Sequence, residues 1–178
     1  MRYSVNEIKN ILDSNNFIVS KSIIQLPECN IEHCLTDSRQ VSFIDTTLFV
    51  ALETNTGSGH KYIEDLYKQG VKNFLISIWE ASYENYNANF FLVDNTLKAL
   101  QALAMYHRDN FTSQAELFRF PIIGVTGSNG KTIVKEWLYQ LLKDKFNCCR
   151  SPKSYNSQIG VPLSVLNLNK EHNLGIFE

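Results

Sequence analysis

The sequence lacks any apolar run long enough to cross a membrane, and its amino terminus lacks an apolar signal region. A spanning helix needs about 20 consecutive apolar residues, whereas the longest runs here, such as NFLISIW and FFLV, are far shorter. The first ten residues, MRYSVNEIKN, contain no hydrophobic stretch of the kind that a secretion signal requires. We therefore expect no membrane insertion and a cytoplasmic location.

An excess of charge is also lacking, since 17 Lys and Arg face 18 Asp and Glu for a net charge of −1. This balance gives no electrostatic case for nucleic acid binding. The four cysteines have no common zinc-site spacing, and we interpret them as thiols of a reducing compartment; they are Cys29, Cys34, Cys148 and Cys149. The length of 178 residues suffices for one domain and part of a second.

Segments typical of strands and helices alternate along the chain, which predicts an α/β fold. The capping box Ser4–Glu7 opens a helix that we expect to end near Asn15. Residues 61–70 predict a second helix, with Gly70 at its end. Residues 53–60 and 81–89 are polar and predict loops. Dense β-formers predict a buried strand at residues 47–52, and two further strands are predicted at residues 72–77 and 90–93.

The second half of the chain contains a new strand-to-helix unit. Asp94 can cap a helix through Asn110, and the weakly patterned stretch 112–119 is the predicted linker. The following elements are expected in the order of a strand in PIIGVTG, a helix over 132–143, a strand near NCC and a strand in LGIFE. These elements cannot enclose a core alone. We therefore expect domains at 1–111 and 120–178, with the chain stopping inside the second.

The stretch GVTGSNGKT predicts a phosphate-binding loop, although the common spacing would require a glycine at Val125. It follows a buried strand and opens a helix, whose amino terminus attracts anions. Lys131 is expected to reach the β- and γ-phosphates of a nucleotide, and the Thr132 hydroxyl to bind Mg²⁺. The predicted ATP-binding residues are Thr126, Gly127, Ser128, Asn129, Gly130, Lys131 and Thr132.

Three motifs together resemble one protein family. TGSNGKT after an apolar strand resembles the ATP loop of the Mur ligases and their folylpolyglutamate synthetase relatives. TDSR at 36–39, followed by TLFVAL and GSGHKYI, resembles the amino-terminal domain of the Mur ligases that add the third peptide residue or the terminal dipeptide. SYNSQIGVPLSVLNL at 154–168 resembles a segment of the dipeptide-adding members, although IGVPL alone would fit a core turn equally well. The resemblance covers essentially the whole chain.

The resemblance implies a small amino-terminal α/β domain followed by the start of a P-loop-type central ATPase domain. It implies a UDP-sugar site at Asp37, Ser38, Arg39, Gly59 and His60, with Ser58 where the family usually has Asp. It implies catalytic roles for Lys131 and Asn156, with Ser154 and Ser157 at two positions where the family has asparagine. Thr132 and Glu178 are the implied Mg²⁺ ligands.

The implied activity is that of an ATP-dependent amide ligase of peptidoglycan synthesis. Such an enzyme adds D-alanyl-D-alanine to UDP-N-acetylmuramoyl-tripeptide through an acyl phosphate. The chain is then an amino-terminal fragment, inactive alone, and the resemblance leaves a downstream alanine racemase fusion open. A non-catalytic module that binds the UDP-sugar peptide and a Mur ligase that adds the third residue are the alternatives. The folate enzymes are disfavoured because they lack a DSR…LFVAL domain.

Overall fold

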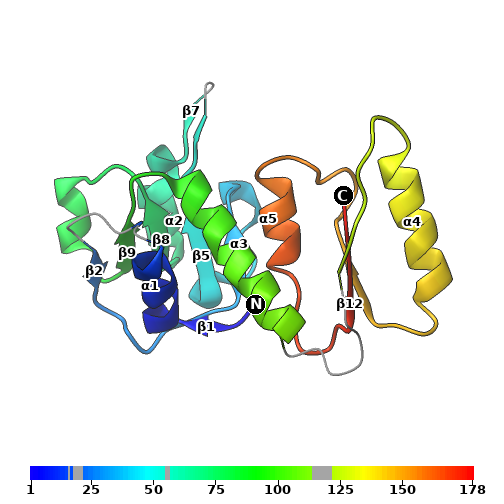
Figure 1. Ribbon diagram of the computed structural model, residues 1–178. Helices are drawn as coiled ribbons and strands as arrows, with labels where there is room; N and C mark the ends of the chain where they lie inside the picture. Colours follow the sequence, from blue (N-terminus) through cyan, green and yellow to red (C-terminus); the bar gives the residue numbers. More distant parts are fainter. Residues whose placement is uncertain (16, 18–21, 55–56, 114–121) are drawn as a thin grey trace. The chain divides into compact units, whose positions relative to one another are not determined.

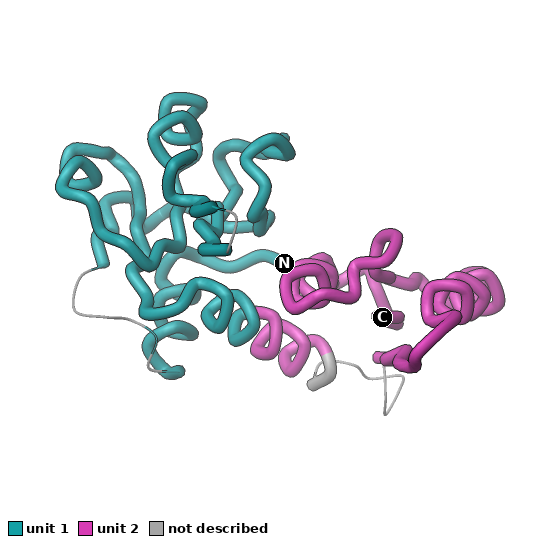
Figure 2. Tube along the Cα trace, turned by 90° about the horizontal axis from the view of Figure 1, so that it is seen from above, with its two compact units in different colours: residues 1–103 teal, residues 104–178 magenta. Residues whose placement is uncertain are grey.

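The structure is a computed structural model that describes residues 1–15, 17, 22–54, 57–113 and 122–178. The described chain divides into two compact units, Met1–Leu103 and Ala104–Glu178 (Figure 2). Each unit combines helices with a mainly parallel sheet, as the alternating pattern predicts (Figure 1). Among the described residues, no helix has both the length and the apolar character that a membrane crossing needs.

Unit 1 opens with helix α1 (Val5–Ser14), and the predicted capping box fixes its start. The Ser4 hydroxyl accepts a hydrogen bond from the Glu7 N–H at 3.2 Å, and the Glu7 carboxylate accepts one from the Ser4 N–H at 2.7 Å. These two bonds pair donors that a helix start leaves unsatisfied. The buried face matches the predicted spacing, with Val5, Ile8, Ile11 and Leu12.

A five-stranded sheet forms the core of unit 1. Its order is β2 (Ile23–Ile24), β9 (Asn89–Leu92), β8 (Asn73–Ile76), β5 (Thr47–Val50) and β4 (His33–Leu35). The last four strands run parallel, and β2 pairs antiparallel at the edge. Every residue of β5 and β8 is buried, which explains the apolar run that follows the polar first residue of each strand. A separate antiparallel pair joins β1 (Tyr3–Ser4) to β3 (Asn30–Ile31).

Helix α2 (Ile63–Gln69) ends at Gly70, which is left-handed with φ 108°, as predicted. The stretches predicted as loops contain more structure than their polar sequences indicate. Glu53–Thr54 pairs antiparallel with Gly57–Ser58, and η4 (Ala81–Asn85) places Tyr83 in the core, where its ring stacks on Phe90 at 4.7 Å between centroids. The short elements are η1 (Ser38–Gln40), η2 (Ile44–Thr46), β6 (Glu53–Thr54), β7 (Gly57–Ser58), η3 (Gly59–Tyr62) and η4 (Ala81–Asn85).

Helix α3 (Thr96–Ser113) corrects two predictions. Its cap is Asn95 rather than Asp94, because the Asn95 side-chain oxygen accepts a hydrogen bond from the Lys98 N–H at 2.9 Å. The helix continues to Ser113 and so includes the first two residues of the linker predicted at 112–119. The remainder of that linker lies outside the described residues. The compact units meet inside α3, and the domain limits 1–111 and 120–178 stay predictions.

Unit 2 contains three parallel strands in the order β10 (Ile122–Gly124), β12 (Leu174–Phe177) and β11 (Cys148–Arg150). Helix α4 (Lys131–Leu142) and helix α5 (Gly160–Val165) both contact β12, and they lie on opposite sides of it (Figure 1). The IGVPL sequence therefore forms a short helix rather than a turn. Because the strands are parallel, the segments that follow them leave from one edge of the sheet.

Candidate nucleotide site and sugar-binding surface

The predicted phosphate loop connects β10 to α4. Val125 donates its N–H to the Phe177 carbonyl at 2.7 Å, so the loop leaves the sheet directly after β10. Gly130 is the N-cap of α4 and has φ 76°, while Gly127 has φ 149°. Both values lie where glycine is favoured over residues with a Cβ atom. The backbone therefore turns tightly at the helix start, where N–H groups are available to an anion.

Lys131 is the first residue of α4, and its side chain folds back over this loop. The Lys131 ammonium donates to the Gly127 carbonyl at 2.8 Å. The contact spans the glycine-rich turn and keeps the positive charge above the loop. The helix amino terminus and this ammonium together favour a phosphate group at this place.

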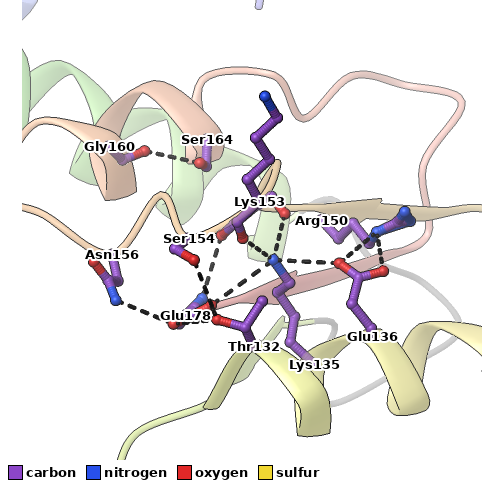
Figure 3. A network of polar contacts seen from close by, with 11 residues as sticks. Thr132, Lys135, Glu136, Arg150, Lys153, Ser154, Asn156, Gly160, Ser164 and Glu178 are labelled. Atoms are coloured by element: carbon purple, nitrogen blue, oxygen red, sulfur yellow. Dashed lines mark hydrogen bonds and ion pairs between the residues drawn. The ribbon is translucent and has the colours of Figure 1, made fainter. Parts of the chain in front are cut away.

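Three predicted residues meet beside the loop, although they come from distant parts of the sequence (Figure 3). The Thr132 hydroxyl lies 2.9 and 2.8 Å from the two carboxylate oxygens of Glu178. The Asn156 amide donates to the same carboxylate at 3.1 Å. Ser154 stands nearby, with its hydroxyl 3.5 Å from that of Thr132. The carboxyl edge of the sheet therefore gathers the ends of β12 and β11 and the start of α4.

The oxygen atoms of this group fit a magnesium ion that is held together with a nucleotide. Thr132 supplies a hydroxyl and Glu178 a carboxylate, which are hard ligands of the kind that Mg²⁺ prefers. Mg²⁺ usually takes only one or two carboxylates from a protein and completes its shell with phosphates and water. Within the described residues, no three His, Cys, Asp or Glu side chains form a closed metal site.

Sequence reasoning missed Lys135, which is completely buried in α4. Its ammonium donates to the Ser151 carbonyl at 2.8 Å and to the Lys153 carbonyl, and it lies 3.8 Å from the Glu178 carboxylate (Figure 3). The available signal was its spacing of three from Thr132, since residues three apart share a helix face. Because lysine side chains are normally exposed to solvent, the residue type alone does not predict that Lys135 is buried.

The predicted sugar-binding residues of TDSR form a short turn after β4. The Asp37 carboxylate caps η1 by accepting the Arg39 N–H at 3.0 Å, and it also accepts the Arg39 guanidinium at 2.9 and 2.8 Å. These hydrogen bonds lower the pKa of Asp37 to about 2. Arg39 remains 86% exposed. Because a guanidinium has five N–H donors, Arg39 retains donors for an anionic ligand, and Ser38 lies beside it in η1.

Gly59 and His60 start η3, and both are engaged within unit 1. A Cβ on Gly59 would lie 2.9 Å from the Leu52 backbone nitrogen, so close packing requires glycine. The His60 Nε2 accepts the N–H groups of Ser77 and Ile78 at 3.0 and 3.1 Å. Its Nδ1 lies 2.9 Å from the Ser58 hydroxyl. Since Nε2 is an acceptor, Nδ1 carries the proton and donates to Ser58.

These contacts determine which polar groups of Ser58 and His60 are used within unit 1. Burial lowers the pKa of His60, which favours the neutral ring that this arrangement needs. The Ser58 oxygen accepts both the His60 ring proton and the His60 N–H, the latter at 3.2 Å. Its own hydroxyl proton is therefore left to be donated elsewhere. Adjacent parallel strands β4 and β5 place the Asp37 turn and the Ser58 turn at one sheet edge.

Comparisons of the sequence and of the fold with known proteins both find similarity to Mur ligases. Residues 125–178 match the family described as the Mur ligase middle domain. Over 97% of its length, the chain is 33% identical to the UDP-N-acetylmuramoyl-tripeptide--D-alanyl-D-alanine ligase of Borreliella burgdorferi. It is 32% identical over 98% of its length to the ligase of the same name from Synechocystis. The chain matches the Mur ligase family.

Solved Mur ligase structures agree with this assignment. A crystal structure of MurF from Acinetobacter baumannii superposes on the whole chain with a TM-score of 0.81 at 23% identity, which supports the fold. The MurF ligase of Thermotoga maritima in complex with ADP covers 83% of the chain, with a TM-score of 0.65 and 29% identity. The chain covers 35% and 31% of these two proteins, respectively. It spans 37% of the length of the two curated Mur ligases.

Proposed function

We propose that the chain is part of an ATP-dependent amide ligase that joins D-alanyl-D-alanine to UDP-N-acetylmuramoyl-tripeptide. The curated relatives that carry this name align with almost the entire chain. A relative from Thermotoga maritima was solved with ADP, which supports nucleotide binding by this chain. The observation that carries the proposal is the start of α4, where the Lys131 ammonium contacts the Gly127 carbonyl and the Thr132 hydroxyl contacts the Glu178 carboxylate.

In the proposed reaction, a carboxylate oxygen of the tripeptide attacks the γ-phosphorus of ATP, and ADP leaves. The amine of D-alanyl-D-alanine then attacks the acyl phosphate carbonyl, and phosphate leaves as the nitrogen loses a proton. Reactions of this kind depend on positioning and on neutralising charge. Lys131 and the loop N–H groups hold the phosphates in this scheme. Thr132 and Glu178 would hold Mg²⁺, with the Asn156 amide hydrogen-bonded to the Glu178 carboxylate, and the ion would neutralise phosphate charge.

Unit 1 provides the proposed surface for the UDP-sugar part of the substrate. Arg39 supplies an exposed guanidinium for the diphosphate, and Asp37 holds its orientation. Ser58 donates its hydroxyl proton, and Ser38 offers a second hydroxyl. Gly59 and His60 shape this surface, because their groups are engaged by the fold of unit 1. Cytoplasmic location follows from this proposal, since its nucleotide substrates are cytoplasmic metabolites.

Substitution of Lys131 by alanine tests the proposed reaction in the native protein at its full length. Phosphate release should require the tripeptide nucleotide and D-alanyl-D-alanine together, and Lys131→Ala should reduce the rate at least a hundredfold. Lys143→Ala is the matched control, because Lys143 is exposed at the far end of the same helix. Near-normal turnover by Lys131→Ala would contradict the proposal.

The amine substrate separates the proposed ligase from its alternatives. Turnover with D-alanyl-D-alanine but not with a diamino acid identifies the dipeptide-adding reaction. The reverse preference identifies a Mur ligase that adds the third residue. Binding of the UDP-sugar peptide without any ATP turnover would leave a binding module as the function.

A further inference from the structure

Lys135 is a buried lysine whose position the phosphate loop alone does not explain. An ammonium group has three N–H donors, and burying it is unfavourable unless they are paired. Two of them meet the carbonyl oxygens of Ser151 and Lys153. The remaining neighbours are two carboxylates, Glu136 at 3.4 Å and Glu178 at 3.8 Å (Figure 3). The two carboxylates differ in how far they depend on the positive charge of Lys135.

Glu136 already has another cation. Arg150 places its Nε 3.2 and 3.3 Å from the two Glu136 oxygens, and both side chains are about one-third exposed. Solvent therefore helps to compensate this pair. Glu178 differs, because its side chain is only 2% exposed and its hydrogen-bond donors, Thr132 and Asn156, are neutral. Lys135 is thus the cation that compensates the buried Glu178 carboxylate.

The two carbonyl contacts of Lys135 fix the segment that follows β11. Lys153 has a left-handed backbone with φ 49°, which is unfavourable for a residue other than glycine. The contact with the Lys135 ammonium holds its carbonyl in this conformation. Ser154 and Asn156 come directly afterwards and reach Thr132 and Glu178. One side chain therefore holds both the carboxylate and the segment that surrounds it.

We propose that Lys135 is a positioning residue for the magnesium complex of a nucleoside triphosphate, acting through Glu178 and through residues 151–156. This inference depends on the proposed function, because it assumes that such a complex binds at the loop. The complex is anionic overall, so a buried cation near it is electrostatically favourable. Lys135 itself touches neither phosphate nor metal in this scheme, since its donors are used by the protein.

The test compares nucleotide affinity with and without magnesium in the native protein at its full length. A non-hydrolysable ATP analogue is titrated in Mg²⁺ and in a chelator, and the ratio of the two Kd values measures the magnesium gain. Loss of groups that orient metal ligands usually reduces metal affinity by 10- to 100-fold. Lys135→Met should therefore reduce the magnesium gain about tenfold or more, whereas Lys143→Met should leave it unchanged.

A second substitution shows whether the effect passes through the carboxylate. In a Glu178→Gln background, where the charged partner is absent, Lys135→Met should reduce the magnesium gain by a smaller factor than in the unsubstituted protein, and the remaining factor measures the part that passes through residues 151–156. An equal factor in both backgrounds would contradict a role through Glu178. If Lys135→Met does not fold, Lys135→Gln replaces it and is judged by the same ratio, because its amide can still donate to a carbonyl. Circular dichroism establishes that each variant is folded before titration.

Each outcome separates this inference from the function on which it depends. A folded variant with an unchanged magnesium gain overturns the positioning role. A raised gain also overturns it, because Lys135 would then only repel the divalent cation. If the unsubstituted protein does not bind the analogue, the proposed function fails and this inference fails with it. Binding with a magnesium gain that Lys135 does not affect leaves the proposed function intact.

Discussion

The two units differ in the polar groups that they bury, although unit 2 also buries the neutral side chains of Ser151 and Ser164. Unit 1 buries neutral groups, such as the imidazole of His60 and the amides of Asn73 and Asn89, each hydrogen-bonded to its surroundings. Unit 2 buries the charged pair Lys135 and Glu178. A buried ion pair is weak evidence for stability, because desolvation offsets its attraction. The neutral groups therefore serve the fold, whereas the charged pair is retained at the edge where we propose that nucleotide binds.

The largest effect on stability is expected from removing the charge in unit 2. Lys135→Met leaves the Glu178 carboxylate buried without its cation, and breaking such a pair typically destabilises by roughly 3–5 kcal/mol. Urea denaturation of the native protein should show this loss in the transition of unit 2. The double variant Lys135→Met/Glu178→Gln should recover part of it. A loss below about 1 kcal/mol would show that the pair contributes little, and the contrast between the units would disappear.

A smaller loss is expected from removing one neutral group in unit 1. The Asn89 side chain accepts the Leu26 N–H at 2.8 Å and donates to the Leu26 carbonyl at 3.0 Å and to Asn73 at 2.8 Å. Asn89→Ala should cost about 1–3 kcal/mol for leaving buried groups unpaired. Thermal denaturation should show this in unit 1 alone. Asn87→Ala is the neighbouring control, because the Asn87 contact to Tyr67 uses its backbone N–H.

The buried neutral imidazole of His60 should make the stability of unit 1 depend on pH. Burial lowers the pKa of His60, and the opposing effects of Glu53 and Glu80 are smaller. As the pH falls from about 6.5 towards the pKa of His60 in the folded state, His60 binds a proton in the unfolded state but remains neutral in the folded state. The titration of His60 should therefore lower the free energy of unfolding of unit 1 by up to about 1.4 kcal/mol per pH unit in this window.

The measurement for His60 is the free energy of unfolding at pH 7.0 and at pH 5.5. His60→Gln should be less stable than the unsubstituted protein at neutral pH, and the gap should narrow in acid. His33→Gln controls for the other titrating imidazole of unit 1, whose pKa is also lowered by burial. A constant gap between the two pH values would mean that His60 titrates alike in both states.

Local sequence signals predicted the elements that local chemistry determines. The Ser4 capping box, the Gly70 helix end and the apolar strands β5 and β8 all depend on a few adjacent residues, and the structure confirms them. The GSNGKT loop also lies between a strand and a helix as predicted. Its binding role, and that of the TDSR turn, remains a proposal.

Contacts between distant residues could not be predicted in the same way. Lys135 is buried only because β11 and the end of β12 bring two carbonyls and a carboxylate to it, 16 to 43 positions along the chain. Tyr83 sits in a polar stretch, yet stacking on Phe90 makes it part of the core. The family resemblance implies a ligand role for His60, but its tertiary partners, the N–H groups after β8, are not visible in a motif.

The smallest expected effect concerns the start of α3, where the sequence predicts Asp94 as the helix cap and the structure has the adjacent Asn95. Asp94 and Asn95 are both good helix caps, so propensity alone could not separate them. In the structure only Asn95 accepts the Lys98 N–H, and the Ala99 N–H bonds to the Asn95 carbonyl at 3.0 Å, as the first helical bond requires. Asn95→Ala should therefore cost about 1 kcal/mol, and Asp94→Ala less than about 0.5 kcal/mol. Chemical denaturation of the two variants decides between the caps, because the reverse order would place the start of α3 at Asp94.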